Sequence, residues 1–317
     1  MSNEIPVRRM AHYVAELDEG GLGAVDAVRV NERKSNLWLD AWRDLRGRWM
    51  FWVSAVFVFL LIVVALFPGL FVQVSPHACE LANSNADPRA GHPLGFDFQG
   101  CDVYSRVIHG TSTSLSVGVI VTIIIAVMGI VIGAFAGFFG GWVDSLLMRI
   151  GDMFFAIPYV LAAVVIMSMF LANRNILVIS LAIGFFGWPS LARILRSEIL
   201  RVRSSDFVMA SEALGVSRVR TMFTHVLPNS IAPVIVVSTI GLAAAITAEA
   251  TLSFLGVGLP SDVVSWGSDI SQAQIRLRTD PMPLIYPSIA LSLTVLSFIM
   301  LGETVRDALD PKARALR

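Results

Sequence analysis

The chain has 317 residues, a formal net charge of zero, 55% hydrophobic residues and only 15% charged residues. Its mean hydropathy of +0.70 is far above that of a typical soluble domain. These values exclude an ordinary soluble protein, and we expect no nucleic-acid partner. The sequence predicts an all-α integral membrane protein that lies in a lipid bilayer.

The N-terminal residues 1–36 are polar and charged, and no short apolar core followed by a cleavage site occurs in them. We expect a disordered cytoplasmic tail without a removable signal peptide. In residues 37–48, Leu and Trp side chains recur at helical spacing opposite Asp and Arg. This pattern predicts an amphipathic helix at the membrane interface. Packing against a loop of another subunit is the alternative.

Six apolar runs have the roughly 20 residues that are needed to cross the hydrocarbon core of a membrane. We expect transmembrane helices at residues 50–74, 113–139, 153–173, 175–193, 226–257 and 283–303. With a cytoplasmic N-terminus, 19 of the 24 Lys and Arg residues lie inside and 5 lie outside. Because cytoplasmic loops are enriched in these residues, both termini are predicted to be cytoplasmic.

Both cysteines of the chain, Cys79 and Cys101, lie in the largest expected extracytoplasmic loop, residues 75–112. Two cysteines that face an oxidising compartment can form a disulfide. Such a bond would restrict the unfolded chain by about 3 kcal/mol. Two free thiols are the alternative.

The remaining residues, 113–317, form the expected core of the protein. Gly129, Gly133 and Gly137 are spaced by four in its first apolar run, so they lie on one helix face. Small residues at this spacing allow close helix packing in lipid, either inside one bundle or in a dimer contact. Pro158 and Pro189 interrupt later runs, and such breaks are tolerated where neighbouring helices or a water-filled cavity satisfy the freed backbone groups.

The segment from Arg193 to Asn229 interrupts the apolar runs with six arginines, which is typical of a cytoplasmic loop. Ser205 and Asp206 are suitable N-caps for a first helix, Gly215 is a suitable stop, and Ser217 can cap a second helix. We therefore expect a helix, a glycine turn and a second helix within a loop at 194–225, before Pro228 opens the next span. An ordinary amphipathic loop helix is the simplest interpretation of this pattern.

The fifth apolar run contains one ionisable residue, Glu249, and ionisable groups at membrane depth usually face the interior of a bundle. Glu249 lies toward the outer end of the run, so reaching the membrane interface is the alternative. Together with the hydroxyls of Thr247, Thr251 and Ser292, it is a candidate for lining a pathway. Hydrogen bonding between helices is the commoner use of such hydroxyls.

Signals of enzymatic chemistry are missing from the sequence. Neither Lys34 nor Lys312 lies in a phosphate-binding loop, and no HExxH, GxSxG or CxxC motif occurs. The five histidines do not pair at the spacing of metal ligands. We expect no catalytic residue, no metal site and no cofactor bound by this chain.

Several stretches resemble the permease subunits of ATP-binding-cassette importers of the dipeptide and oligopeptide group, over residues 37–317. The cytoplasmic loop is similar to their Glu-Ala-Ala, three residues, Gly and Leu-Pro pattern, with Met209 in place of the glutamate. The other stretches are LWLDAWRDLRGRWMFW, the segment around Gly95, Asp97, Gly100, Asp102, Ser105, Arg106 and Gly110, the run from Ala248 through Gly267, and the ending GETVRDALDPKARALR.

The resemblance implies a six-helix type I importer permease fold and a coupling helix that docks on a separate ATPase subunit. The residues expected at that contact are Phe207, Val208, Met209, Ala210, Ser211, Glu212, Leu214 and Gly215. It also implies a sister permease, two cytoplasmic ATPase subunits that bind ATP and Mg²⁺, and an extracytoplasmic substrate-binding protein.

These expectations describe a permease that imports dipeptides or oligopeptides across the bacterial plasma membrane. A nickel or other small-solute importer of the same fold is the nearer alternative. An ion-coupled carrier or a membrane receptor is the more distant one, since a carrier usually has paired acidic groups at the midplane.

Overall fold

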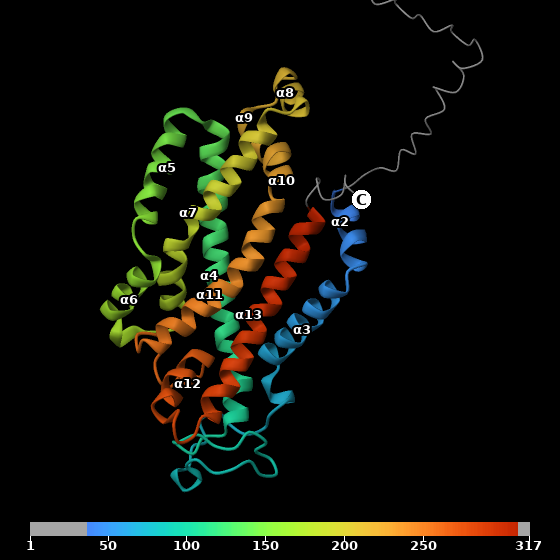
Figure 1. Ribbon diagram of the computed structural model, residues 1–317. Coiled ribbons are helices and arrows are strands. Elements are labelled where there is room, and N and C mark those ends of the chain that lie inside the picture. The colour runs from blue at the N-terminus through green and yellow to red at the C-terminus, as the bar shows by residue number, and fades with distance from the viewer. Residues whose placement is uncertain (1–36, 310–317) are drawn as a thin grey trace, which may run out of the picture.

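The computed structural model describes residues 37–309, and the described part of the chain is a bundle of helices (Figure 1). The prediction of a disordered tail at residues 1–36 and the last eight residues of the expected ending lie outside the described residues. The α-helices are α2 (Leu37–Arg46), α3 (Trp49–Leu66), α4 (Val103–Phe139), α5 (Gly141–Phe155), α6 (Tyr159–Met169), α7 (Ile176–Arg203), α8 (Asp206–Ala213), α9 (Arg218–Thr221), α10 (Leu227–Ser230), α11 (Ala232–Phe254), α12 (Trp266–Ala273) and α13 (Met282–Leu309).

Five of these helices, α3, α4, α7, α11 and α13, are long and apolar enough to cross a membrane. The helices α5 and α6 meet at a bend of 76° and form a sixth span if the pair counts as one. The break falls directly before Pro158, which cannot donate a backbone hydrogen bond within a helix. The expected fold class is confirmed, with a broken helix in the position of the third predicted span.

Several helix boundaries differ from the predicted spans. The first span ends at Leu66 and not at residue 74, because Pro68 follows at once. The second helix begins at Val103, ten residues before the predicted 113, because the Asp102 side chain accepts a hydrogen bond from the Ser105 amide and caps it. Apolar periodicity could not show this start, since the first turns of α4 are polar.

The glycine stripe of α4 packs against α7 within this chain. A Cβ atom at Gly133 would lie 2.6 Å from the Ala192 carbonyl oxygen, and one at Gly137 would lie 2.9 Å from the Arg196 carbonyl oxygen. The two backbones are therefore in close contact, which only small residues permit. Packing inside one bundle explains the stripe.

The N-terminal helix α2 lies beside the end of α13 (Figure 1). Ala41 and Leu45 are buried against Ala308 and Leu309, whereas Trp42 is half exposed. Part of the apolar face of α2 is thus used inside the chain, and its location at a membrane interface stays a prediction. The amphipathic pattern did not reveal this intramolecular packing, because it identifies the apolar face of a helix but not the surface against which that face packs.

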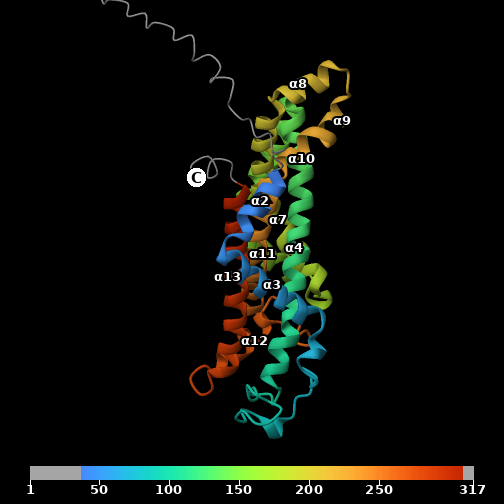
Figure 2. The same cartoon turned by 90° about the vertical axis from the view of Figure 1, so that its right-hand side faces the viewer.

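The two ends of the molecule are formed by different kinds of structure. The short helices α8 and α9 form one end, and the long loop between α3 and α4 forms the opposite end (Figures 1 and 2). The described start of the chain at α2 and its described end at α13 both lie on the side of α8. This arrangement is consistent with both termini and the coupling loop facing one compartment.

Candidate functional site

The predicted helix, glycine turn and second helix are present at the α8 end of the molecule. Helix α8 ends at Ala213, and Gly215, two residues later, has a φ of +80°, in the left-handed region that favours glycine. The Gly215 amide donates to the Glu212 carbonyl, and the Val216 amide donates to the Ser211 carbonyl. These two bonds form a Schellman motif, so the chain reverses sharply between α8 and α9.

The eight residues expected at an ATPase contact do not share one face of α8. Val208 and Ser211 are buried inside the chain, and the Ser211 hydroxyl lies 3.3 Å from the Thr221 hydroxyl. Since both side chains contact residues of this chain, they position α8 and are not available for a partner. The other six residues, Phe207, Met209, Ala210, Glu212, Leu214 and Gly215, are exposed.

Exposed large apolar side chains on α8 and in the segment that follows it define what we call the coupling surface. It consists of Phe207, Met209 and Leu214 on and after α8, together with Val219 and Phe223; Leu214 is 84% exposed. Their exposure makes these side chains candidates for a contact with another protein. Sequence reasoning missed Val219 and Phe223, which lie after the glycine turn.

Helix α8 is connected to the transmembrane helices through a single apolar cluster. Val208 packs in this cluster with Val202 of α7 and Met222 of the following turn. That turn, Met222–Val226, is π-helical, and such turns occur often at functional sites. After it, the Asn229 side chain donates to the His225 carbonyl at 2.7 Å. The His-x-Leu-Pro-Asn stretch joins the coupling loop to α11, and the His225 carbonyl within it has a hydrogen-bond donor.

Two arginines of the predicted loop lie on α7 and form ion pairs with α5. Helix α7 continues to Arg203, so the loop begins about ten residues later than the predicted 194. Arg196 forms a bidentate pair with Asp144 of α5 at 2.5 and 2.6 Å, and Arg193 pairs with Asp152. These ion pairs stabilise the extension of α7 against α5, and they explain why a charged segment stays helical.

Glu249 lies at a junction of three helices and does not reach an interface. Its side chain is fully buried and accepts hydrogen bonds from the hydroxyls of Ser114, Ser253 and Ser265. Ser265 also caps the N-terminus of α12. The carboxylate therefore joins α4, α11 and α12, which is a structural role for this candidate pathway residue.

The other candidate pathway residues are exposed but do not come together. Thr247 and Thr251 lie on α11, and their hydroxyls donate to the carbonyls of Ala243 and Thr247 in the same helix. Ser292 lies on α13. None of the three lines the large cavity of the bundle. Their role in a pathway stays a prediction.

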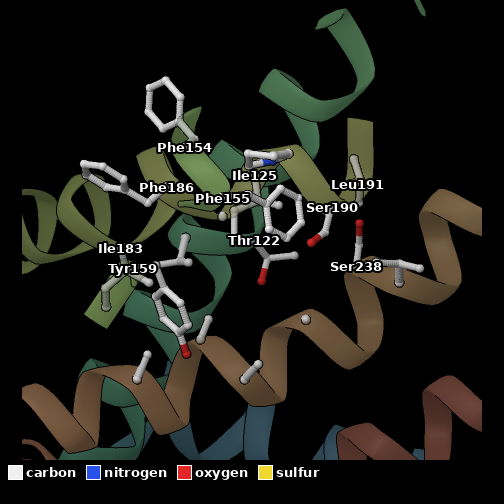
Figure 3. A pocket seen from close by; sticks show the side chains of 18 of the residues that line it. Thr122, Ile125, Phe154, Phe155, Tyr159, Ile183, Phe186, Ser190, Leu191 and Ser238 are labelled. Atoms are coloured by element: carbon white, nitrogen blue, oxygen red, sulfur yellow. The ribbon is translucent and has the colours of Figure 1, made fainter. Parts of the chain in front are cut away.

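A cavity of about 400 Å³ lies at the break between α5 and α6 (Figure 3). Its wall consists of residues from α4, α5, α6, α7 and α11, and most of them are apolar or aromatic. Tyr159, Ser190 and Ser238 place hydroxyl groups in this wall (Figure 3). Its volume is within the range of small-molecule sites in proteins.

The long loop between α3 and α4 is closed on itself by a disulfide, and its Asp97 lies beside a buried ion pair. Cys79 and Cys101 are disulfide-bonded in the structure. Asp97 accepts hydrogen bonds from the amides of Gln99 and Cys101 at 2.8 and 2.9 Å. The loop is thereby folded into a compact unit at the end opposite to α8.

Arg106 connects this loop to α12. Its Nε donates to Asp269 at 3.0 Å, a second guanidinium nitrogen donates to the same oxygen, and Asp97 lies 4.0 Å away. Two carboxylates thus face one buried guanidinium. Burial raises the pKa of Asp269 to about 6, although Arg106 acts in the opposite direction.

We expect the stability of the protein to depend on pH through Asp269. Because the folded-state pKa lies above the ordinary value, the contribution of this carboxyl is full at low pH and is lost as the pH rises through about 6. The free energy of unfolding should fall by about 1 kcal/mol from this group between pH ~5 and ~7.5. SDS unfolding of Asp269→Asn, which cannot titrate, should lack this part of the pH profile. Parallel profiles for both proteins would contradict the prediction.

The comparisons with known proteins agree with this architecture. Residues 129–315 match the family described as binding-protein-dependent transport system inner membrane component. Residues 36–88 match the N-terminal transmembrane domain of oligopeptide transport permease C. Together these matches include the coupling loop, the broken helix pair and the first span.

Named relatives extend over nearly the whole chain. The oligopeptide transport system permease protein OppC of Bacillus subtilis is 32% identical over 291 residues, which are 92% of this chain and 95% of that protein. The glutathione transport system permease protein GsiD of Escherichia coli O6:K15:H31 is 33% identical over 300 residues, 93% of this chain and 97% of that protein.

A second GsiD protein, from Shigella flexneri, is 36% identical over 297 residues, 92% of this chain and 96% of that protein. The predicted family is confirmed by these relatives, and a carrier or receptor is not favoured. The chain belongs to the binding-protein-dependent transport permeases, and it is a multi-pass membrane permease subunit of an ATP-binding-cassette importer.

Proposed function

We propose that this chain forms, with a sister permease, the translocation pathway of a bacterial importer for dipeptides or oligopeptides. The observation that carries the proposal is the similarity, over 92% or more of the chain, to permeases named for oligopeptide and glutathione transport. Glutathione is itself a small peptide, so both names indicate one substrate class. A nickel importer is not favoured by these relatives.

In this proposal, two cytoplasmic ATPase subunits bind ATP and Mg²⁺ and dock on the coupling surface. An extracytoplasmic binding protein delivers the peptide at the end that carries the disulfide-bonded loop. The protein lies in the plasma membrane with both termini in the cytoplasm. The excess of Lys and Arg on the α8 side and the position of α2 and α13 at that end support this orientation.

The coupling would work by alternating access. Closure of the ATPase pair would shift α8, and the apolar cluster around Val208 would pass this shift to α7 and, through Met222 and Val226, toward α11. A close-packed cluster transmits such a displacement because it has little free volume to absorb it. The contacts of α8 must differ between the two states for ATP to bias them.

The test is purification of the tagged chain from native membranes, with identification of the proteins that accompany it. We expect a sister permease, ATPases and a peptide-stimulated ATP hydrolysis. Uptake of labelled peptide and of nickel by a deletion strain would then identify the substrate class. Restoration of nickel uptake alone by the cloned chain would overturn the peptide assignment.

The turn after α8 gives a sharper test of coupling. We expect Gly215→Ala to weaken binding of the ATPase subunits about fivefold, because a left-handed alanine costs about 1 kcal/mol and disfavours the end of α8. No atom within 4 Å would meet the added Cβ, so the effect is conformational and not steric. The affinity is measured by titrating purified ATPase onto the permease in nanodiscs.

Gly91→Ala is the matched control. Gly91 also has a left-handed φ, +87°, with no atom within 4 Å of an added Cβ, but it lies in the extracytoplasmic loop. It should impose the same backbone strain and leave ATPase binding unchanged. Equal affinities for wild type and Gly215→Ala would show that the geometry of this turn does not matter for coupling.

A further inference from the structure

Three hydroxyl groups of the cavity differ in their hydrogen bonding from most others in the transmembrane helices. Hydroxyls such as those of Ser180, Thr239 and Thr294 donate to the carbonyl one turn earlier in their own helix. In the part of the chain that the structure describes, the hydroxyls of Tyr159, Ser190 and Ser238 form no hydrogen bond, and all three line the cavity. Tyr159 and Ser190 are exposed and Ser238 is partly exposed in this chain, so their hydroxyls are accessible to a polar ligand.

The hydroxyls are placed on different elements around one space. Tyr159 lies at the start of α6, Ser190 lies on α7 and Ser238 lies on α11 (Figure 3). Ser190 and Ser238 occupy one side of the cavity and Tyr159 the other (Figure 3). Pro189, which also lines the cavity, leaves the Phe185 carbonyl without its intrahelical donor.

Apart from Thr122, whose hydroxyl donates to the Gly118 carbonyl, the rest of the wall is apolar and carries no charged side chain. Its aromatic part consists of Phe154, Phe155 and Phe186, next to Ile125 and Ile183 (Figure 3). A charged group placed here would lose its hydration without gaining a counter-charge. An aromatic or branched apolar group would gain contacts on several sides, and aromatic pairs add to this gain.

We propose that the cavity binds one apolar side chain of a passing peptide, while the three hydroxyls hydrogen-bond to the adjacent peptide backbone. The proposal rests on the proposed function and names the preferred substrate: peptides with a bulky apolar residue. A lipid acyl chain would fill the apolar space equally well, but it offers no hydrogen-bonding group. The combination of free hydroxyls with an apolar wall therefore favours a peptide over lipid.

The test compares the uptake of tri-alanine and of Ala-Phe-Ala by the assembled importer in proteoliposomes. Gly241 lines the cavity, and an added Cβ would meet no atom within 4 Å. We expect Gly241→Leu to fill the space and to lower the uptake of Ala-Phe-Ala about tenfold relative to tri-alanine. The same binding protein is used throughout, so its own selectivity cancels in the ratio between variant and wild type.

A second variant removes the hydroxyls and keeps the shape of the cavity. Tyr159→Phe/Ser190→Ala/Ser238→Ala should lower the uptake of both peptides about threefold, because both have the same backbone. Ser168 of α6 gives the controls, since it lies outside the cavity and its hydroxyl donates to the Val164 carbonyl. Ser168→Leu and Ser168→Ala should transport both peptides at the wild-type rate.

The possible outcomes distinguish a failure of the cavity proposal from a failure of the proposed function. An unchanged uptake ratio in Gly241→Leu, or an equal loss of both peptides, would overturn the cavity proposal while peptide import by the wild type stands. Wild-type uptake by the triple variant would overturn the role of the hydroxyls, as expected if lipid fills the space. Failure of the wild-type importer to take up either peptide would overturn the proposed function itself.

Discussion

Replacing Arg106 by methionine should destabilise the protein by about 3–5 kcal/mol, because it leaves buried carboxylates without their counter-charge. Asp269 is almost fully buried, and Arg106 is its only ion-pair partner within residues 37–309. The free energy of unfolding is measured by SDS titration in mixed micelles, followed by tryptophan fluorescence. The indole of Trp266 donates to the Val107 carbonyl next to Arg106, so this tryptophan should report on the change.

The double variant Arg106→Met/Asp269→Leu is the control for this prediction. It removes both members of the pair, and a buried ion pair replaced by apolar groups is often neutral in stability. Asp97 remains satisfied by the amides of Gln99 and Cys101. The double variant should therefore recover most of the lost stability. A single Arg106→Met variant that unfolds at the same SDS fraction as wild type would show that this pair does not stabilise the fold.

The sequence predicted the membrane helices because apolar length is a local property. It also indicated the broken span through Pro158 and the coupling turn through Gly215, since both residues restrict or permit specific backbone angles. The boundaries were harder to predict. The charged end of α7 is helical because Arg193 and Arg196 form ion pairs with acidic residues of α5. Apolar periodicity cannot predict such ion pairs.

The site was predictable only where its residues are close in sequence. The eight-residue stretch around α8 was identified, but the inward direction of Val208 and Ser211 depends on Met222 of the π-helical turn and on Thr221 of α9, which they contact. Glu249 was identified as unusual, yet its partner Ser114 is 135 residues away. Arg106 and Asp269 are separated by 163 residues. A single sequence does not show which residues far apart along the chain will be in contact, so these two interactions could not be predicted.

Introducing a charge into the coupling surface should separate the permease from its ATPase while the bundle stays folded. We expect Leu214→Asp to weaken ATPase binding by at least about 2 kcal/mol, roughly 30-fold, because the most exposed apolar residue of the coupling surface would have to bury a carboxylate. Peptide uptake should be lost in parallel. Since Leu214 is 84% exposed in the chain alone, the SDS unfolding midpoint should stay at the wild-type value.

Two further variants determine how such a loss is interpreted. Leu81→Asp makes the same change at a residue that is 80% exposed but lies in the loop between α3 and α4, at the end opposite to α8, so ATPase binding should be unaffected. Val208→Asp places a charge in the cluster beneath α8 and should lower both ATPase binding and the unfolding midpoint. If Leu214→Asp binds ATPase like wild type while Val208→Asp does not, α8 influences the interface only through its packing, and the contact itself must lie elsewhere on the α8 end of the molecule.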